Sequence, residues 1–129
     1  MLYEVSTRHT PKQAGQALEA AAQKHKFGVL TVHNLKETMA KKGVEFSKEC
    51  LIYEVCNPGQ AKKVLEANAS ISTALPCRIA IFQEGDHTKL STIKPTAMLA
   101  LYGNKELNPV AQEVEQVIVA IMNEAAGSD

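Results

Sequence analysis

The stretch Cys50–Gln60 constrains the fold of this chain more than any other, because a buried strand leads directly into a capped helix there. Its first seven residues are apolar, β-branched or aromatic except for one charge, Glu54, and this composition predicts a largely buried β-strand. Asn57 suits the N-cap of a helix because its side-chain oxygen can accept a free backbone N–H of the first turn. Pro58 suits the next position because it has no N–H, and Gln60 can reach back to complete a capping box.

The thiol of Cys56 lies at the junction between this strand and this helix. Reactive cysteines and small-molecule sites favour the carboxyl ends of strands, and a helix N-terminus can lower the pKa of a nearby thiol. The same position also suits a buried cysteine that acts as a small hydrophobic side chain, since cysteine is among the most buried residue types. The second interpretation is the more common one, so the position of Cys56 alone does not assign a function.

The composition excludes several classes of protein. The 129 residues carry 14 basic and 14 acidic side chains, and a net charge of zero removes the long-range attraction of a basic domain to nucleic acid or anionic membranes. No apolar run is long enough to span a bilayer, and Met1–Glu4 begins a strand rather than a signal peptide. The three cysteines are an odd number without a CxxC motif, so we expect no disulfide framework and a reducing, cytoplasmic location.

The remaining patterns predict one α+β domain over residues 1–129, in which helices back a sheet. Strands are predicted at 2–6, 29–33, 50–56, 78–83 and 88–93, with a brief further strand at 44–46. Helices are predicted to start after Thr10, Asn34, Asn57 and Asn108, with a short one at 95–101. The pairs Thr10-Pro11 and Asn108-Pro109 repeat the cap-and-proline arrangement of residues 57 and 58. The segment 70–76 is ambiguous, and the tail 125–129 is expected to fray.

Short motifs are spread over nearly the whole chain. They are Phe27-Gly28-Val29-Leu30 with His33 and Leu35, Lys42-Gly43-Val44, Glu54-Val55-Cys56-Asn57-Pro58 and Leu75-Pro76-Cys77. Together with Pro95 and the Asn-Pro start of the last helix, they resemble the DUF302 family of small bacterial and archaeal proteins, and the Cys-Asn-Pro and Pro-Cys pieces are the most specific. The resemblance implies a homodimer with a TBP-like, mostly antiparallel sheet rich in β-α-β units and backed by helices. It implies no activity, because the family is named for having none assigned, and a TBP-like shape does not imply DNA binding.

Cys56 and Cys77 are the only pair of thiols that can share a site. Cys50 is excluded, since six residues of continuous strand separate it from Cys56 by about 20 Å. Residues 68–76 can span roughly 30 Å when extended. If they recross the sheet, the two strands run antiparallel and Cys77 lies beside Cys56 in one rim, with His33 alongside. If they stay at the far end, the strands run parallel and the thiols lie at opposite ends.

Local motifs for metals or catalysis are absent from the sequence. None of the histidines, His9, His25, His33 and His87, stands three or four residues from another histidine or a cysteine, so neither a metal nor a cofactor is assigned. His33 ends a predicted strand and is the best functional candidate among them. Glu54 is expected to pair with a residue on a neighbouring strand. No nucleophile elbow and no glycine loop for phosphate occurs.

Three classes of function remain. We favour a non-catalytic dimeric module that binds a small ligand or a protein partner near Cys56, with Asn57, Cys77 and His33 as further candidate site residues. The second class is a thiol-dependent protein that handles sulfur, redox signals or a metal through Cys56 and Cys77. The third is a purely structural dimer. An enzymatic activity is not favoured, and neither nucleic acid nor a membrane is expected as a partner.

Overall fold

Five strands form one antiparallel sheet in the order β1-β5-β4-β3-β2. The computed structural model describes residues 1–127. The strands are β1 (Leu2–Thr7), β2 (Gly28–Asn34), β3 (Cys50–Cys56), β4 (Cys77–Glu84) and β5 (His87–Ile93). Every neighbouring pair runs antiparallel. The prediction of a single α+β domain built on an antiparallel sheet is therefore confirmed, and β3 has the bounds that its sequence predicts.

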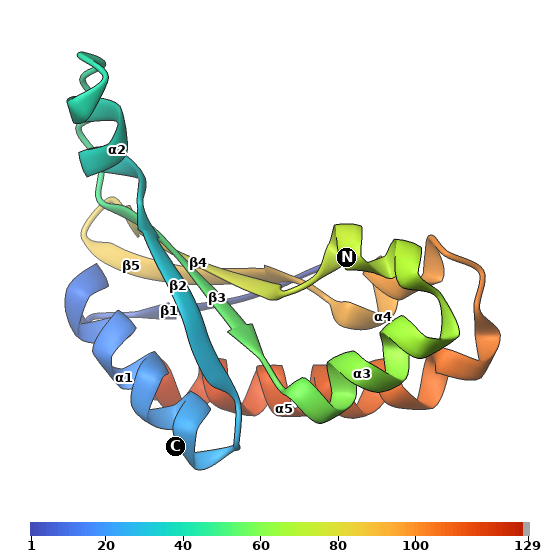
Figure 1. Ribbon diagram of the computed structural model, residues 1–129. Coiled ribbons are helices and arrows are strands. Elements are labelled where there is room, and N and C mark those ends of the chain that lie inside the picture. The colour runs from blue at the N-terminus through green and yellow to red at the C-terminus, as the bar shows by residue number, and fades with distance from the viewer. Residues whose placement is uncertain (128–129) are drawn as a thin grey trace.

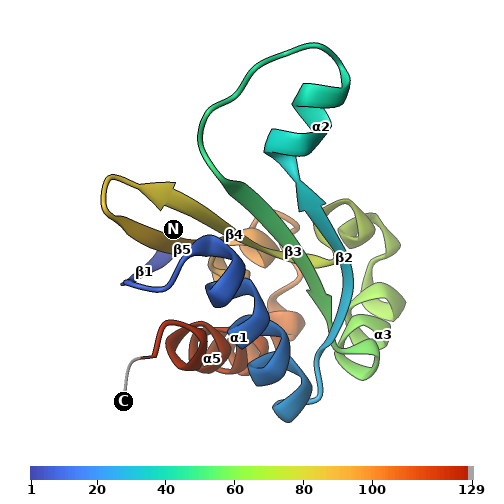
Figure 2. The same ribbon diagram turned by 90° about the vertical axis from the view of Figure 1, so that its left-hand side faces the viewer.

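The helices are distributed unevenly around this sheet. They are α1 (Pro11–Lys24), α2 (Leu35–Lys41), α3 (Pro58–Ala67), α4 (Pro95–Ala100) and α5 (Asn108–Ala125), with 3-10 turns η1 (Ala69–Ala74) and η2 (Lys105–Leu107). Figures 1 and 2 show α1 and α5 packed together under one face of the sheet. The elements α3, η1 and α4 form a lobe at the end of the sheet where β3 ends, and α2 projects from the opposite end (Figure 1). Within the described residues, the other face of the sheet carries no helix, and we call it the open face.

The main core lies between the sheet and the pair α1 and α5. Alternate strand residues point into it, so Tyr53 and Val55 of β3 are buried together with Ile79 and Ile81 of β4. The lobe has a small core of its own, formed by Val64, Ile71 and Leu107. The seam between the two cores lies at the end of β3, where the candidate site residues were predicted.

Three of the predicted helix caps form, at Thr10, Asn34 and Asn57, and Oδ1 of Asn34 accepts the backbone N–H of Glu37 at 3.1 Å. Thr10 and Gln13 make a complete capping box at the start of α1, and the Asn57 side chain accepts a hydrogen bond from the backbone N–H of Gln60, 3.2 Å away. The reciprocal bond from Gln60 was wrongly predicted, because its side-chain amide donates instead to Glu113 of α5, at 2.9 Å. The cap at Asn108 was also wrong. Asn108 has helical backbone angles, φ −55° and ψ −44°, and makes no side-chain cap, because the turn η2 already leads the chain into the helix.

Three other local predictions need correction. Residues 44–46 form no strand, because the ladder between β2 and β3 ends at Asn34 and Leu51 and leaves this segment exposed, with no strand of the described chain beside it. The ambiguous segment before β4 is the turn η1. The tail does not fray from residue 125, because Ala125 ends α5 fully buried in the main core. Residues 128 and 129 lie outside the described part of the chain.

Strand β2 forms one edge of the sheet and carries a bulge. Its register with β3 shifts between Val29 and Thr31, so the intervening Leu30 has no partner in the ladder and is 60% exposed. No helix within residues 1–127 is both long enough and apolar enough to cross a membrane.

Candidate functional site

The structure brings Cys56 and Cys77 together. In the antiparallel ladder between β3 and β4, Cys77 lies opposite Val55, the residue directly before Cys56. Strand geometry therefore separates the Cα atoms of the two cysteines by about 5–7 Å. Of the two arrangements that the sequence left open, the antiparallel one is present.

The chain reaches this arrangement without recrossing the sheet. After β3, helix α3 runs outward from the end of the sheet, and η1 brings the chain back to the same end (Figure 1). Residues 68–76 are therefore mostly a compact 3-10 turn rather than the extended crossing that the antiparallel alternative assumed. The lobe fills the space that this excursion encloses.

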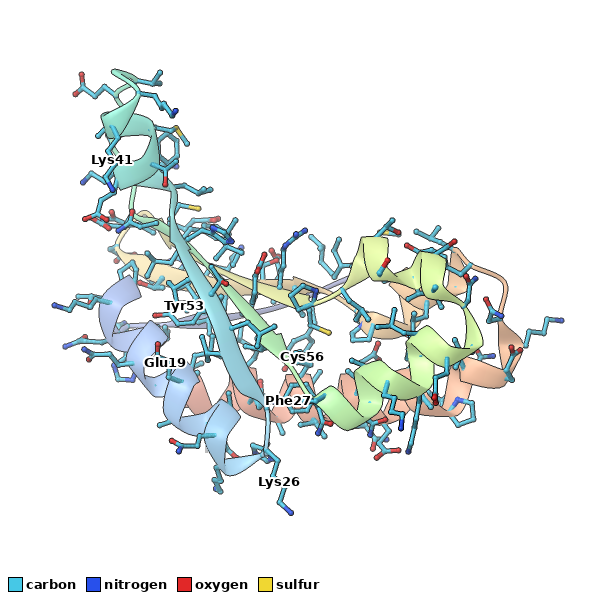
Figure 3. The ribbon with its side chains drawn as sticks, in the orientation of Figure 1. Glu19, Lys26, Phe27, Lys41, Tyr53 and Cys56 are labelled. Carbon is cyan, nitrogen blue, oxygen red and sulfur yellow. The ribbon has the colours of Figure 1, made fainter. Side chains whose placement is uncertain are left out.

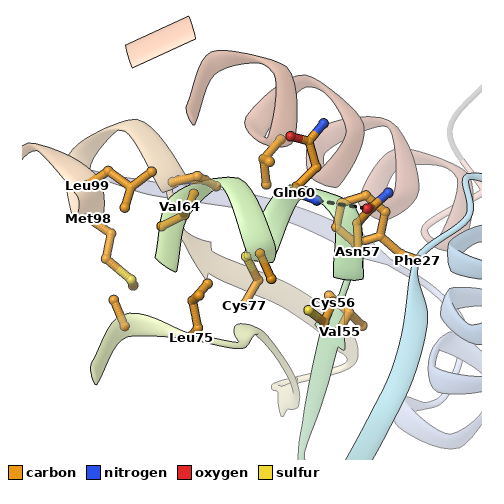
Figure 4. Close-up of a pocket in the computed structure, with 14 residues that line it drawn as sticks. Phe27, Val55, Cys56, Asn57, Gln60, Val64, Leu75, Cys77, Met98 and Leu99 are labelled. Carbon is orange, nitrogen blue, oxygen red and sulfur yellow. Dashed lines mark hydrogen bonds between the residues drawn. The ribbon is translucent and has the colours of Figure 1, made fainter. Parts of the chain in front are cut away.

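Cys56 and Cys77 line one apolar cavity at the seam between the two cores (Figure 4). Its volume is about 50 Å³. The walls come from seven parts of the fold, because the segment before β2, the strands β3 and β4, the end of η1 with Leu75 after it, and the helices α3, α4 and α5 all contribute side chains. The cavity is about a third of the size of an engineered protein cavity that accepts benzene, roughly 150 Å³. In its present form it accepts the end of an apolar group rather than a whole cofactor.

Asn57 lies at the edge of the same cavity, and its cap fixes its orientation. Because Oδ1 accepts the N–H of Gln60, the side chain is held at the start of α3 (Figure 4). Three of the four candidate site residues, Cys56, Asn57 and Cys77, are thus adjacent to one another.

His33 does not join them, which corrects the rim predicted from the sequence. Since β2 runs antiparallel to β3, the start of β2 lies beside the end of β3, and Gly28 rather than His33 is opposite Cys56. His33 is opposite Ile52 on the open face, and its Nε2 lies 3.3 Å from Oε2 of Glu54. A constellation of His33 with Cys56 does not exist.

Glu54 has the cross-strand partner that the sequence predicts. Nε of Arg78, directly opposite on β4, donates to Oε2 of Glu54 at 3.2 Å. This hydrogen bond, assisted by His33, lowers the pKa of the Glu54 carboxyl below its ordinary value. The three side chains form a polar cluster on the open face, separate from the cavity.

The environment of the thiols opposes ionisation. Burial raises the pKa of Cys56, and it raises the pKa of Cys77 to about 11, to which the neighbouring Cys56 contributes. The shift of the Cys56 pKa is therefore upward, opposite to the lowering considered from the sequence, and both thiols are protonated near neutral pH. Within residues 1–127, no three His, Cys, Asp or Glu side chains are placed to share a metal ion.

Comparison with known proteins identifies the family. The model for the domain of unknown function DUF302 matches residues 3–125. The chain belongs to the DUF302 family. Its fold is similar to the crystal structure of an uncharacterized conserved DUF302 protein from Bacillus stearothermophilus, with 30% sequence identity and a TM-score of 0.91 over 96% of this chain and 97% of that one. No curated protein matches the sequence.

The sequence of this DUF302 domain did not reveal most of the cavity wall. Phe27 is buried beside the thiols, and its position directly before the Gly28 that faces Cys56 was the available signal. Leu75 could have been found from its closeness to Cys77 in the chain. Met98 could not, because only the packing of α4 against α5 and η1 brings it to the cavity.

Proposed function

We propose that this DUF302 protein is a non-catalytic, homodimeric binding module whose cavity beside Cys56 takes the apolar end of a small ligand. The apolar cavity lined by Cys56 and Cys77 is the observation that carries the proposal. Binding sites are concave and mostly apolar, and they favour seams between structural units. An apolar side chain presented by a partner protein has the same chemistry and is the alternative occupant.

The size of the cavity limits how a ligand binds. A volume of about 50 Å³ holds only a few carbon atoms, so the rest of a larger ligand lies outside or moves the lobe away from the sheet. Val64, Ile71 and Leu107 form a core within the lobe and with the start of α5, so α3 and η1 can shift without opening the main core. The expected ligand therefore has a narrow alkyl end.

A filling variant tests this cavity. Ala74→Leu enlarges a side chain in the cavity wall, and Ala69→Leu makes the same change at an exposed position of the same turn, η1. The probes are n-butanol, n-hexanol and hexanoate, titrated while the methyl resonances of Val64 and Leu75 are recorded by NMR. We expect shifts in the wild type and in Ala69→Leu, and a strong reduction of them in Ala74→Leu. Equal shifts in both variants, or no shift in the wild type up to the solubility limit, contradict the proposal.

A thiol-based function is the second candidate, and the adjacency of Cys56 and Cys77 favours it. Their raised pKa values oppose it, because the thiolate is the reactive form. Intact-mass measurement after mild iodoacetamide treatment, with and without a reductant, separates the two candidates. Rapid alkylation of either cysteine near neutral pH, or a mass loss that shows a disulfide, would favour thiol chemistry.

The homodimer and the cytoplasmic location belong to the same proposal. Exposed apolar side chains, among them Val44, Phe46 and Ile93, support association with another protein surface. Three free thiols suit a reducing compartment. Light scattering that shows a monomer at tens of micromolar, the scale of ordinary micromolar affinities, contradicts the dimer.

A further inference from the structure

The open face carries a mixed apolar and polar surface at the centre of the sheet. The ladder aligns Ile52 of β3 with Ala80 of β4, and Ala80 with Ser91 of β5. Phe82 is on the same side of the sheet, two residues after Ala80 in β4. All four side chains are only partly buried, whereas the residues between them point into the main core.

One end of the open face is bordered by a projecting arm, residues 35–49, which comprises α2 and the segment that follows it. Figures 1 and 2 show the arm rising from the ends of β2 and β3 on the side away from α1 and α5, with the lobe at the other end of the face. No residue of α2 is buried. Val44 is 54% exposed and Phe46 is 37% exposed, so the arm presents apolar side chains that do not enter either core.

The charges on the open face are paired within the chain. Glu54 contacts Arg78, and Lys89 lies 3.8 Å from Glu4 and 3.4 Å from Glu84. A covering partner would therefore bury charges that already have counter-ions, which is far less costly than burying isolated ones. Positive and negative side chains also alternate across this face. A second copy of the same surface can therefore face it across a two-fold axis without like-charge repulsion.

The open face alone is smaller than a standard dimer interface, so a covering copy would also need to contact the arm. Five strands about 4.8 Å apart and roughly 20 Å long give a flat face on the order of 500 Å². A standard stable interface buries about 800 Å² on each partner. Two arms, exchanged reciprocally, supply additional contact area on both sides.

We propose that a second copy of this chain covers the open face in a two-fold dimer, with the arm of each copy lying over the open face of the other. The arrangement rests on the homodimer of the proposed function and assigns it a surface. Val44 and Phe46 contact the partner's sheet around Ala80. The cavity beside Cys56 lies at the lobe, outside this contact.

Paired substitutions test the contact. Val44→Asp combined with Phe46→Asp alters only exposed side chains of the arm, and Ala80→Arg places a cation on the open face. By sedimentation velocity over a concentration series, we expect each variant to weaken the dimer by roughly a hundredfold, because charge would face apolar surface. Ala20→Asp, on the exposed side of α1, should leave the dimer unchanged. Circular dichroism melting curves establish that each variant is folded.

Mixing the two weakened variants gives the decisive measurement. If the arm of one copy contacts the face of the other, a heterodimer of the two variants has one native contact, between the native arm and the native face. Its other contact joins the substituted aspartates to the substituted arginine, so the heterodimer should form. No recovery on mixing contradicts the contact, because the two substituted surfaces then do not meet. If Ala80→Arg does not fold, the dimer dissociation constant of the arm variant alone tests the contact, and a value equal to that of the wild type contradicts it.

The other outcomes separate this proposal from the dimer itself. A wild type that stays monomeric overturns both. A wild-type dimer that withstands both the arm and the face substitutions overturns only the assigned surface. Leu30→Asp probes the competing pairing along the edge of β2, and dissociation by this change alone would place the interface there.

Discussion

Gly15 of α1 lies directly over the aromatic ring of Tyr53 of β3, and the two residues leave no room for a Cβ atom between them. A Cβ built on Gly15 would lie 2.7 Å from Cζ of Tyr53 and closer still to its hydroxyl oxygen. Both residues are buried in the main core. The missing side chain therefore sets how closely α1 approaches the sheet.

We expect Gly15→Ala to destabilise the fold by about 1–3 kcal/mol, the usual cost of overpacking, despite a gain of about 1 kcal/mol in helix propensity. Tyr53→Phe removes the hydroxyl that would clash, so it should recover part of the loss in the double variant. Urea denaturation of the two single variants and the double variant measures the coupling. Additive changes in the free energy of unfolding would show that residue 15 and residue 53 do not share this space.

The cap at Asn57 should contribute to global stability, because it starts the helix that closes the cavity. Asn57→Ala is expected to lower the free energy of unfolding by about 1 kcal/mol. Asn34→Ala removes the equivalent bond to Glu37 in the exposed arm, and Asn108→Ala removes no cap, so neither should move the denaturation midpoint comparably. An unchanged midpoint for Asn57→Ala would count against the cap.

Stability should fall at alkaline pH because of Cys77. Below about pH 9.0, the ordinary pKa from which the Cys77 thiol is shifted, the thiol holds its proton in both the folded and the unfolded state. Between that pH and about 11 the unfolded state loses the proton while folded Cys77 keeps it, so stability declines by about 2–3 kcal/mol over this window. Unfolding free energies of the wild type and Cys77→Ala, compared across this range, isolate the contribution. Parallel pH curves for the two proteins would show that Cys77 titrates normally in the fold.

Arg78 should control the ionisation of Glu54 more strongly than His33 does. The hydrogen bond from Arg78 is the largest cause of the lowered pKa, so Arg78→Gln should raise the Glu54 pKa more than His33→Gln. A lowered carboxyl pKa stabilises the folded state fully only above the pKa that the group has in the unfolded state. The contribution of Glu54 to stability is therefore lost as the pH falls through its folded pKa. Carbon-detected NMR titration of the carboxylate measures each shift. A larger effect of His33→Gln would reverse this order.

Local signals accounted for the correct sequence predictions. β3, the cap at Asn57 and the strands β4 and β5 each depend on residues a few positions apart, and each formed as expected. Asn108 shows the limit of such signals. Its Asn-Pro pair is the same as that at residue 57, but the backbone enters α5 through η2 and leaves no terminus for the side chain to cap.

The failures concern information that is not local. His33 was placed near Cys56 because both lie at strand ends, but strand direction decides which ends meet, and β2 runs opposite to β3. The cavity wall depends on Met98, which the packing of the lobe brings to residues far away in the chain. The sequence left two arrangements open for Cys56 and Cys77, and only the antiparallel one placed them together. The pairing of β4 with β3 decides between the two.

The position of β1 has a consequence for the synthesis of the protein. Among the described elements β1 comes first in the chain, yet it pairs with β5, and the helix that packs most extensively against α1 is α5, far along the sequence. Contacts between such distant segments form slowly, because a long loop must close before they stabilise anything. β1 and α1 thus expose apolar surface until β5 and α5 have been synthesised, and during that interval they are potential clients of chaperones.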